Sequence, residues 1–116
     1  MKREIILYTT ADGKSPVTIF LDSLPNKVFK KITWVLNLVT ELKKIPSVYF
    51  KKIINSDDIY ECRISFSSNI YRIFCFFHKG TMIILTHGII KKTQKTPQDE
   101  IRKAEEYKKD FLRRSK

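Results

Sequence analysis

The sequence predicts an α+β fold in which helices cover one side of a mostly antiparallel sheet and the other side stays open to solvent. Residues 28–42 carry apolar side chains at helical spacing, whereas residues 58–87 change to the period of two that is typical of strands. With 116 residues and 42% hydrophobic content, the chain suits a single domain, residues 1–116, around one packed core.

The first half of the chain predicts a strand followed by two helices. Residues 5–9 are apolar and β-branched, as in a strand. Ser15 followed by Pro16 is a typical helix start, which predicts a short helix over about 16–21. A longer helix follows, and its expected buried stripe comprises Val28, Ile32, Val35, Val39 and Leu42. Trp34 neighbours this stripe, so we expect it to pack in the core or against a helix rather than to stack a base.

The second half predicts an antiparallel meander and a last helix. Strands are expected at residues 60–66, 70–77 and 82–87, with a turn between each pair. Residues 47–57 form a connector before the first of these strands. The last helix carries an apolar stripe of Ile101, Ala104, Tyr107 and Phe111. The expected order is therefore an N-terminal strand, a two-helix hairpin, an antiparallel three-stranded meander and a C-terminal helix.

The charge of the chain indicates a polyanionic partner. The formal net charge is +11, and no acidic residue occurs from Cys62 to Gln98. A surface of one sign favours nucleic acid. An acidic protein is the second candidate partner. A membrane surface is the third, because no helix pairs a basic face with an exposed apolar face.

Neither a metal site nor a membrane segment is expected. Cys62 and Cys75 fall inside predicted strands and form no ligand pattern, so we interpret them as buried free thiols in a reducing cytoplasm. The two histidines lack the matching acids or thiols of a metal-ligand set, and no cofactor motif is present. No apolar run reaches the length of a membrane span, and the first apolar run suits a strand better than a signal peptide.

Sheet register predicts a row of basic groups across the meander. If each turn has two residues, Arg63 lies opposite Arg72, and Arg72 lies opposite His87. If a turn is longer or shorter by two residues, the groups stay on one face of the sheet. If it differs by one residue, they lie on opposite faces. Like charges opposite each other destabilise a sheet unless an acid or a bound anion neutralises them. Two alternatives therefore stay open, a salt-bridge ladder with Glu61 or an anion site.

The row leads into a basic, hydroxyl-rich segment that contains Lys91, Lys92 and Lys95. Together these groups suit RNA cleavage by the neighbouring 2′-hydroxyl without a metal. Arginine binds phosphate oxygens, lysine contacts the backbone, and histidine serves as acid or base. The same groups could equally bind nucleic acid without cutting it, and His87 alone also fits a structural histidine at a strand end.

Two further sets of residues are candidates for RNA contact. Lys51 and Lys52 suit either a phosphate contact or a solvated loop. Tyr71, Tyr60 and Phe74 suit either base stacking or core packing, of which core packing is favoured.

Four segments carry a family resemblance. They are residues 16–25 (PVTIFLDSLP), 60–63 (YECR), 71–74 (YRIF) and 87–97 (HGIIKKTQKTP), of which the last is the most specific. In these segments the chain resembles HigB-like toxins of the RelE/ParE superfamily, in the branch of phage-derived toxins. The resemblance implies a RelE-like fold in a single toxin domain and a type II toxin–antitoxin system. It also implies a HigA-like antitoxin with a helix-turn-helix domain, and cleavage of mRNA on the translating ribosome.

The resemblance also bears on individual residues. Arg63 and Arg72 match basic positions on the middle strands of RelE-like enzymes, and Lys91 or Lys92 matches the basic position after the last central strand. RelE-like enzymes often use a tyrosine near the C-terminus, but here the helical stripe places Tyr107 in the core. His87 is the one counterpart of the histidines that another HigB group uses.

The leading prediction is a ribosome-dependent, metal-independent mRNA endoribonuclease that inhibits translation. The predicted catalytic residues are Arg63, Arg72, His87, Lys91 and Lys92. The predicted RNA-binding residues are Lys51, Lys52, Lys95 and Tyr71. A ParE-like inhibitor of gyrase and a non-catalytic RNA-binding domain are the alternatives, because superfamily membership alone does not decide the activity.

Overall fold

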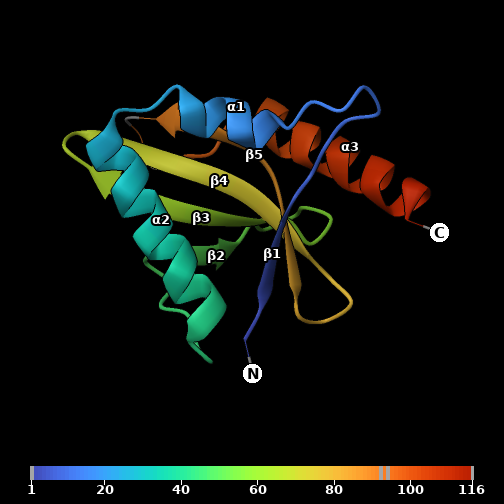
Figure 1. The fold of residues 1–116 in the computed structure, drawn as a ribbon, viewed down its shortest axis with the longest axis horizontal. Coiled ribbons are helices and arrows are strands. Elements are labelled where there is room, and N and C mark those ends of the chain that lie inside the picture. The colour runs from blue at the N-terminus through green and yellow to red at the C-terminus, as the bar shows by residue number, and fades with distance from the viewer. Residues whose placement is uncertain (1, 92, 94, 116) are drawn as a thin grey trace.

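The computed structural model describes residues 2–91, 93 and 95–115, and within them it shows three helices and one five-stranded sheet (Figure 1). The elements are β1 (Glu4–Leu7), α1 (Pro16–Asp22), α2 (Asn26–Glu41), β2 (Phe50–Lys52), β3 (Tyr60–Phe66), β4 (Asn69–His78), β5 (Met82–Lys91) and α3 (Gln98–Arg114). The strands lie in the order β1-β5-β4-β3-β2, with β1 parallel to β5 and the other neighbours antiparallel. The predicted α+β class and three-stranded meander are therefore confirmed.

The helices cover both faces of the sheet, so the expectation of one open face is wrong. One face packs under α1 and α2, in a core that includes Val17, Ile32, Val35, Cys62, Ile73 and Leu85. On the other face, Ile101 and Ala104 of α3 pack with Phe74 and Phe76. β4 and β5 send apolar side chains to both faces. Leaving either face uncovered would cost about 1.5–3 kcal/mol for each large side chain in contact with water.

The helical hairpin follows its sequence signals closely. The Ser15 side chain accepts a hydrogen bond from the Thr18 backbone N–H, which caps α1 as predicted. The α2 stripe is buried except for Leu42, which follows the helix and is 37% exposed. Trp34 is 51% exposed and meets the Tyr49 ring edge-on, so its predicted place in the core is wrong. The stripe of α2 is too narrow to bury a side chain one position outside it.

The predicted connector at residues 47–57 contains a short edge strand, β2. Its three residues pair with β3, so that Lys51 lies opposite Glu61 and Lys52 lies opposite Tyr60. Three residues are too few for a period of two to show in the sequence. Exposed lysines are common on edge strands because they discourage pairing with a second sheet. The strand matters for the site because it fixes both lysines beside β3.

The register of the meander is partly as predicted. Arg63 lies opposite Arg72, as expected, but Arg72 lies opposite Ile89 and not opposite His87. The β4–β5 turn holds three residues, 79–81, which shifts the pairing by one. An irregularity in β5 opposite Phe74 shifts it by one more. Together the register shifts by two residues, so His87 stays on the same face of the sheet as Arg72 but no longer lies directly opposite it.

Close packing joins α1 to β5 at Gly88. A Cβ built on Gly88 would lie 2.3 Å from Cδ2 and 2.8 Å from Cγ of Phe20, so the whole ring occupies the space of a side chain. The absence of a side chain at Gly88 is therefore what lets α1 approach the sheet, and a larger residue must displace the ring.

The first prediction concerns this contact. Replacing Gly88 by alanine should lower the free energy of unfolding by about 1–3 kcal/mol, because the added methyl displaces the Phe20 ring. Denaturant unfolding of the full chain measures the change. In a Phe20→Ala background the same substitution should cost much less. An equal cost in both backgrounds would show that the Phe20 ring is not the cause.

Candidate functional site

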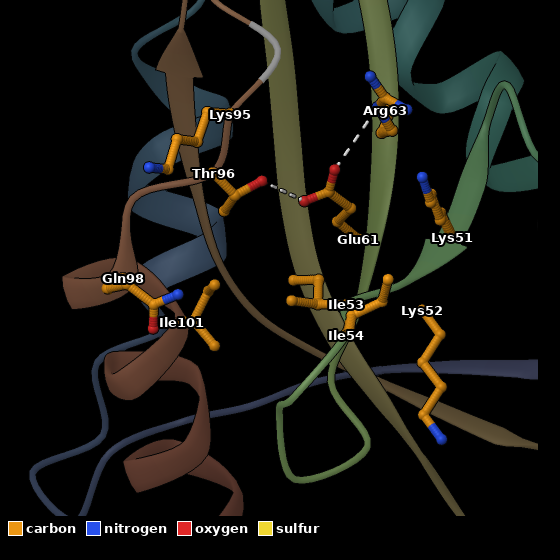
Figure 2. Close-up of a pocket in the computed structure, with 10 residues that line it drawn as sticks. All are labelled: Lys51, Lys52, Ile53, Ile54, Glu61, Arg63, Lys95, Thr96, Gln98 and Ile101. Carbon is orange, nitrogen blue, oxygen red and sulfur yellow. Dashed lines mark hydrogen bonds and ion pairs between the residues drawn. The ribbon is translucent and has the colours of Figure 1, made fainter.

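A groove of about 500 Å³ opens beside β2, β3 and the start of α3, and we call it the basic groove (Figure 2). Its lining residues are Lys51, Lys52, Ile53, Ile54, Glu61, Arg63, Lys95, Thr96, Gln98 and Ile101. Four of these are cations, and Glu61 is the one acid among the lining residues that the structure describes. The cations come from three segments that are distant in sequence, so the fold brings them together.

Strand alternation directs Glu61 and Arg63 toward the groove. Cys62 and Ile64, the residues that alternate with them on β3, are fully buried in the core under α1 and α2. The two polar side chains must therefore point to the opposite face. Pairing of Lys51 with Glu61 across β2 and β3 adds a lysine at the same level of the sheet.

A buried ion pair holds the inner side of the basic groove. Arg72 Nη1 donates to Glu61 Oε1 at 2.5 Å, and the two residues are 1% and 4% exposed. Arg72 also donates to Thr96 Oγ1 at 2.9 Å and to the Thr93 carbonyl oxygen at 3.0 Å. The Thr96 hydroxyl donates to Glu61 Oε2 at 2.8 Å. These bonds tie β3 and β4 to the segment that leads into α3, and this segment carries Lys95.

Glu61 also resolves the repulsion between Arg63 and Arg72. Its Oε1 lies 3.5 Å from Arg63 Nε, in addition to its bond with Arg72. Of the two alternatives left open by the sequence, the salt-bridge ladder is present. The side chain of Arg63 is 22% exposed and lines the groove, whereas that of Arg72 is 1% exposed. Arg63 can therefore meet a ligand directly, while Arg72 supports the groove from below.

His87 lies in a different groove, of about 610 Å³, between α1, β5 and α3. Its ring stacks on Phe74 with a centroid distance of 4.7 Å and meets Tyr107 edge-on. Its Nε2 lies 3.1 Å from Glu100 Oε1. Burial lowers the pKa of His87 to about 4, although the hydrogen bond and the charge of Glu100 oppose this shift. The imidazole is therefore neutral at physiological pH and separate from the cations of the basic groove.

The predicted lysines of the site differ in where they lie. Lys51, Lys52 and Lys95 line the basic groove with exposed side chains. Lys91, at the end of β5 opposite Ile70, is half-buried and does not line the groove. Lys92 lies outside the described residues.

Tyr71 is 5% exposed and belongs to the core under α1 and α2. The Tyr71 ring is therefore packed in the core, as the sequence favoured over base stacking. Tyr60 and Phe74 are also packed, Tyr60 in a stack with Phe50 and Phe74 against His87.

Several groove residues are not identifiable from the sequence pattern. Thr96, Gln98, Ile53, Ile54 and Ile101 reach the groove through loops and a helix start whose positions depend on the folded sheet. The one available signal is Glu61, the last acid before the acid-free stretch. An acid at that place in an otherwise cationic face indicates a charge partner.

Two negative findings complete the description. Within residues 2–91, 93 and 95–115, no three His, Cys, Asp or Glu side chains gather in a group that could hold a metal ion. No helix in the same part of the chain is both long and apolar enough to cross a membrane.

The second prediction concerns the buried ion pair. Replacing Arg72 by methionine should lower the free energy of unfolding by about 3–5 kcal/mol, because the buried Glu61 carboxylate loses its nearest charge partner and keeps the more distant Arg63 guanidinium. Chemical denaturation measures this loss. The double variant Glu61→Leu/Arg72→Met should recover much of it, since both buried charges are then removed. Equal destabilisation of the single and double variants would show that the ion pair is not what the fold needs here.

The third prediction concerns His87 and pH. The folded pKa of about 4 lies below the ordinary 6.5, so the unfolded chain binds more protons between these values. Stability contributed by neutral His87 is full above pH 6.5 and should fall by about 3 kcal/mol as the pH drops toward 4. Denaturation midpoints at pH 7 and pH 4.5 measure the change. His87→Gln, which cannot titrate, should show a shallower pH dependence, and an unchanged slope would contradict the prediction.

Comparison with known proteins places the chain in a family. The family model described as "Phage derived protein Gp49-like (DUF891)" matches residues 19–109, which include every residue of the basic groove. No curated protein matches the chain. The Gp49-like family belongs to the RelE/HigB-like toxin group, which suggests a toxin of a toxin–antitoxin system and implies an antitoxin as partner. The chain therefore belongs to the Gp49-like family of phage-derived proteins.

Proposed function

We propose that the protein is a toxin that cleaves mRNA on the translating ribosome, without a metal, and so inhibits translation. The observation that carries this proposal is the meeting of Lys51, Arg63 and Lys95 in one groove, which Lys52, paired with Asp58 at 2.7 Å, also lines. A groove lined mainly by positively charged side chains attracts a polyanionic chain and holds its phosphates by charge-assisted hydrogen bonds. Membership of the toxin group makes RNA the first polyanion to consider.

The chemistry proposed for the groove is transfer of the phosphodiester to the neighbouring 2′-hydroxyl. The 2′-oxygen attacks phosphorus, and the bond to the 5′-oxygen breaks, which leaves a cyclic phosphate and a 5′-hydroxyl. Arg63 is the residue best placed to bind the phosphate, because its planar guanidinium offers paired donors and its side chain faces the groove. A lysine ammonium, that of Lys51 or Lys95, supplies the proton to the leaving oxygen, and solvent accepts the proton of the 2′-hydroxyl.

The predicted roles of Arg72 and His87 change in this proposal. Arg72 holds Glu61 and the segment with Lys95 in place, and it acts on the substrate through them. His87 is neutral and faces a separate groove, so it supports α3 through Glu100 and Tyr107. A side chain that positions catalytic groups is as necessary to the reaction as one that touches the substrate.

The proposed partners are mRNA, the ribosome and a HigA-like antitoxin with a helix-turn-helix domain. The net charge of +11 favours both RNA partners, because ribosomal RNA presents a dense field of phosphates. The acid-free stretch from Cys62 to Gln98 fits an acidic antitoxin segment that covers this surface when the toxin is neutralised.

The fourth prediction tests the groove in cells and in solution. The triple variant Lys51/Lys52/Lys95→Gln should lose growth arrest on induction and should leave no codon-spaced cuts in primer extension of mRNA. The slope of log affinity for single-stranded RNA against log salt should become shallower by about 1.4 to 2, for two or three lost phosphate contacts, because Lys52 also pairs with Asp58. The matched control Lys27/Lys30/Lys79→Gln removes the same charge at exposed sites outside the groove and should stay toxic.

Three outcomes would contradict the proposal of a nuclease that acts through the basic groove. Intact transcripts together with DNA damage would identify a gyrase inhibitor. RNA binding without cuts, with or without ribosomes, would identify a non-catalytic RNA-binding domain. Full toxicity of the groove variant would show that the activity resides on another surface.

A further inference from the structure

One side of the basic groove is apolar. Ile53 and Ile54, which follow β2, and Ile101 of α3 line it together with the cations, and we call these three residues the isoleucine wall. In Figure 2 Ile53 and Ile54 lie between the lysines of β2 and the segment that carries Lys95 and Thr96, and Ile101 lies on the α3 side, beside Gln98. Ile54 is 79% exposed, the largest fraction among the exposed large hydrophobic residues of the described chain. A groove that needed only to hold phosphates would have no use for this surface.

Hydrogen bonds close the loop that carries Ile54 in this exposed position. The Ile53 N–H donates to the Ile59 carbonyl oxygen at 2.8 Å, which closes the loop at its base. The Ser56 hydroxyl donates to the Ile53 carbonyl oxygen at 2.7 Å and accepts from the Ile59 N–H at 3.1 Å. These bonds hold the loop backbone on both sides of Ile54.

The same loop is also anchored to α3. The Asp57 N–H donates to Glu105 Oε2 at 2.8 Å, and Lys108 Nζ donates to the Asp57 carbonyl oxygen at 2.7 Å. A loop whose backbone is already held loses little backbone entropy when a ligand covers it, so contact with the wall adds to affinity.

Because cations and isoleucines line the same groove, a ligand that fits it is anionic at one end and flat and apolar at the other. A nucleotide of a single strand has both features, because its phosphate carries the charge and its unpaired base offers an apolar face. A duplex hides its bases, and a simple polyphosphate has none. Gln98, which lines the groove beside Ile101, offers an amide that both donates and accepts hydrogen bonds to a base edge.

We propose that the isoleucine wall seats an unstacked base, so that the basic groove takes single-stranded RNA one nucleotide at a time and Ile54 is the main base contact. This inference rests on the proposed function and states how the groove holds its substrate. Lys51, Arg63 and Lys95 bind the phosphate, and Ile54, with the half-buried Ile53 beside it, covers the face of the base. Affinity then depends on the presence of bases and not on charge alone.

The fifth prediction tests base contact by fluorescence anisotropy with the full chain. One probe is a 2′-O-methyl RNA strand of about six nucleotides, which cannot be cleaved through its 2′-oxygen. The other is an abasic strand of the same length and charge. The wild-type protein should bind the intact strand at least about fivefold more tightly than the abasic one, as expected for one stacked base.

Variants separate the wall from the general charge of the groove. Ile54→Ser should lose most of the preference for the intact strand and should keep the affinity for the abasic strand. Ile19→Ser is the matched control, because Ile19 is an exposed isoleucine of α1 that does not line this groove, and it should keep the preference.

Two results would overturn the inference. Equal wild-type affinity for both strands would show that the wall contacts no base. Equal losses for both strands in Ile54→Ser would show a general effect on folding or charge. Failure of this inference can be told apart from failure of the proposed function. Base-dependent binding in solution without mRNA cuts in cells would reject the cleavage and would still support base contact by the isoleucine wall.

Discussion

The buried ion pair between Glu61 and Arg72 is the interaction on which the rest of the site depends. It joins two central strands, and through Thr93 and Thr96 it also fixes the segment that leads into α3. A charge pair removed from water is stable only when its remaining donors and acceptors are satisfied, and here the threonine groups serve that purpose. The position of Lys95 in the basic groove follows from this network. Arg63 opposite Arg72 is tolerated for the same reason.

A second constraint comes from the two apolar faces of the sheet. α1 and α2 cover one face and α3 covers the other, so the ends of these elements create the two grooves. The irregularity in β5 keeps His87 on the face of α3, where burial makes its imidazole neutral. His87 and the four cations thus lie in separate grooves, although His87 and Arg63 are on the same face of the sheet. The family suggests a toxin, and the basic groove is the surface that we propose as its binding site for RNA.

The sequence allows most of the fold and part of the site to be predicted. The periods of α2, β3 and α3 are regular, the cap at Ser15 has a local cause, and the pairing of Arg63 with Arg72 needs only one short turn. The pairing of Arg72 with His87 fails because it depends on a turn and a bulge that both shift by one. β2 is too short for a pattern, and Trp34 lies just outside the buried stripe.

By itself the sequence determines the class of the fold, the order of the central elements and the basic character of one face. These properties depend on local periodicity and on composition, which short segments carry. The tertiary structure alone decides which cations meet, which arginine faces solvent, and that three isoleucines lie beside them. The reason is physical: burial and ion pairing depend on neighbours that are distant in the chain, and only the packed sheet brings them together.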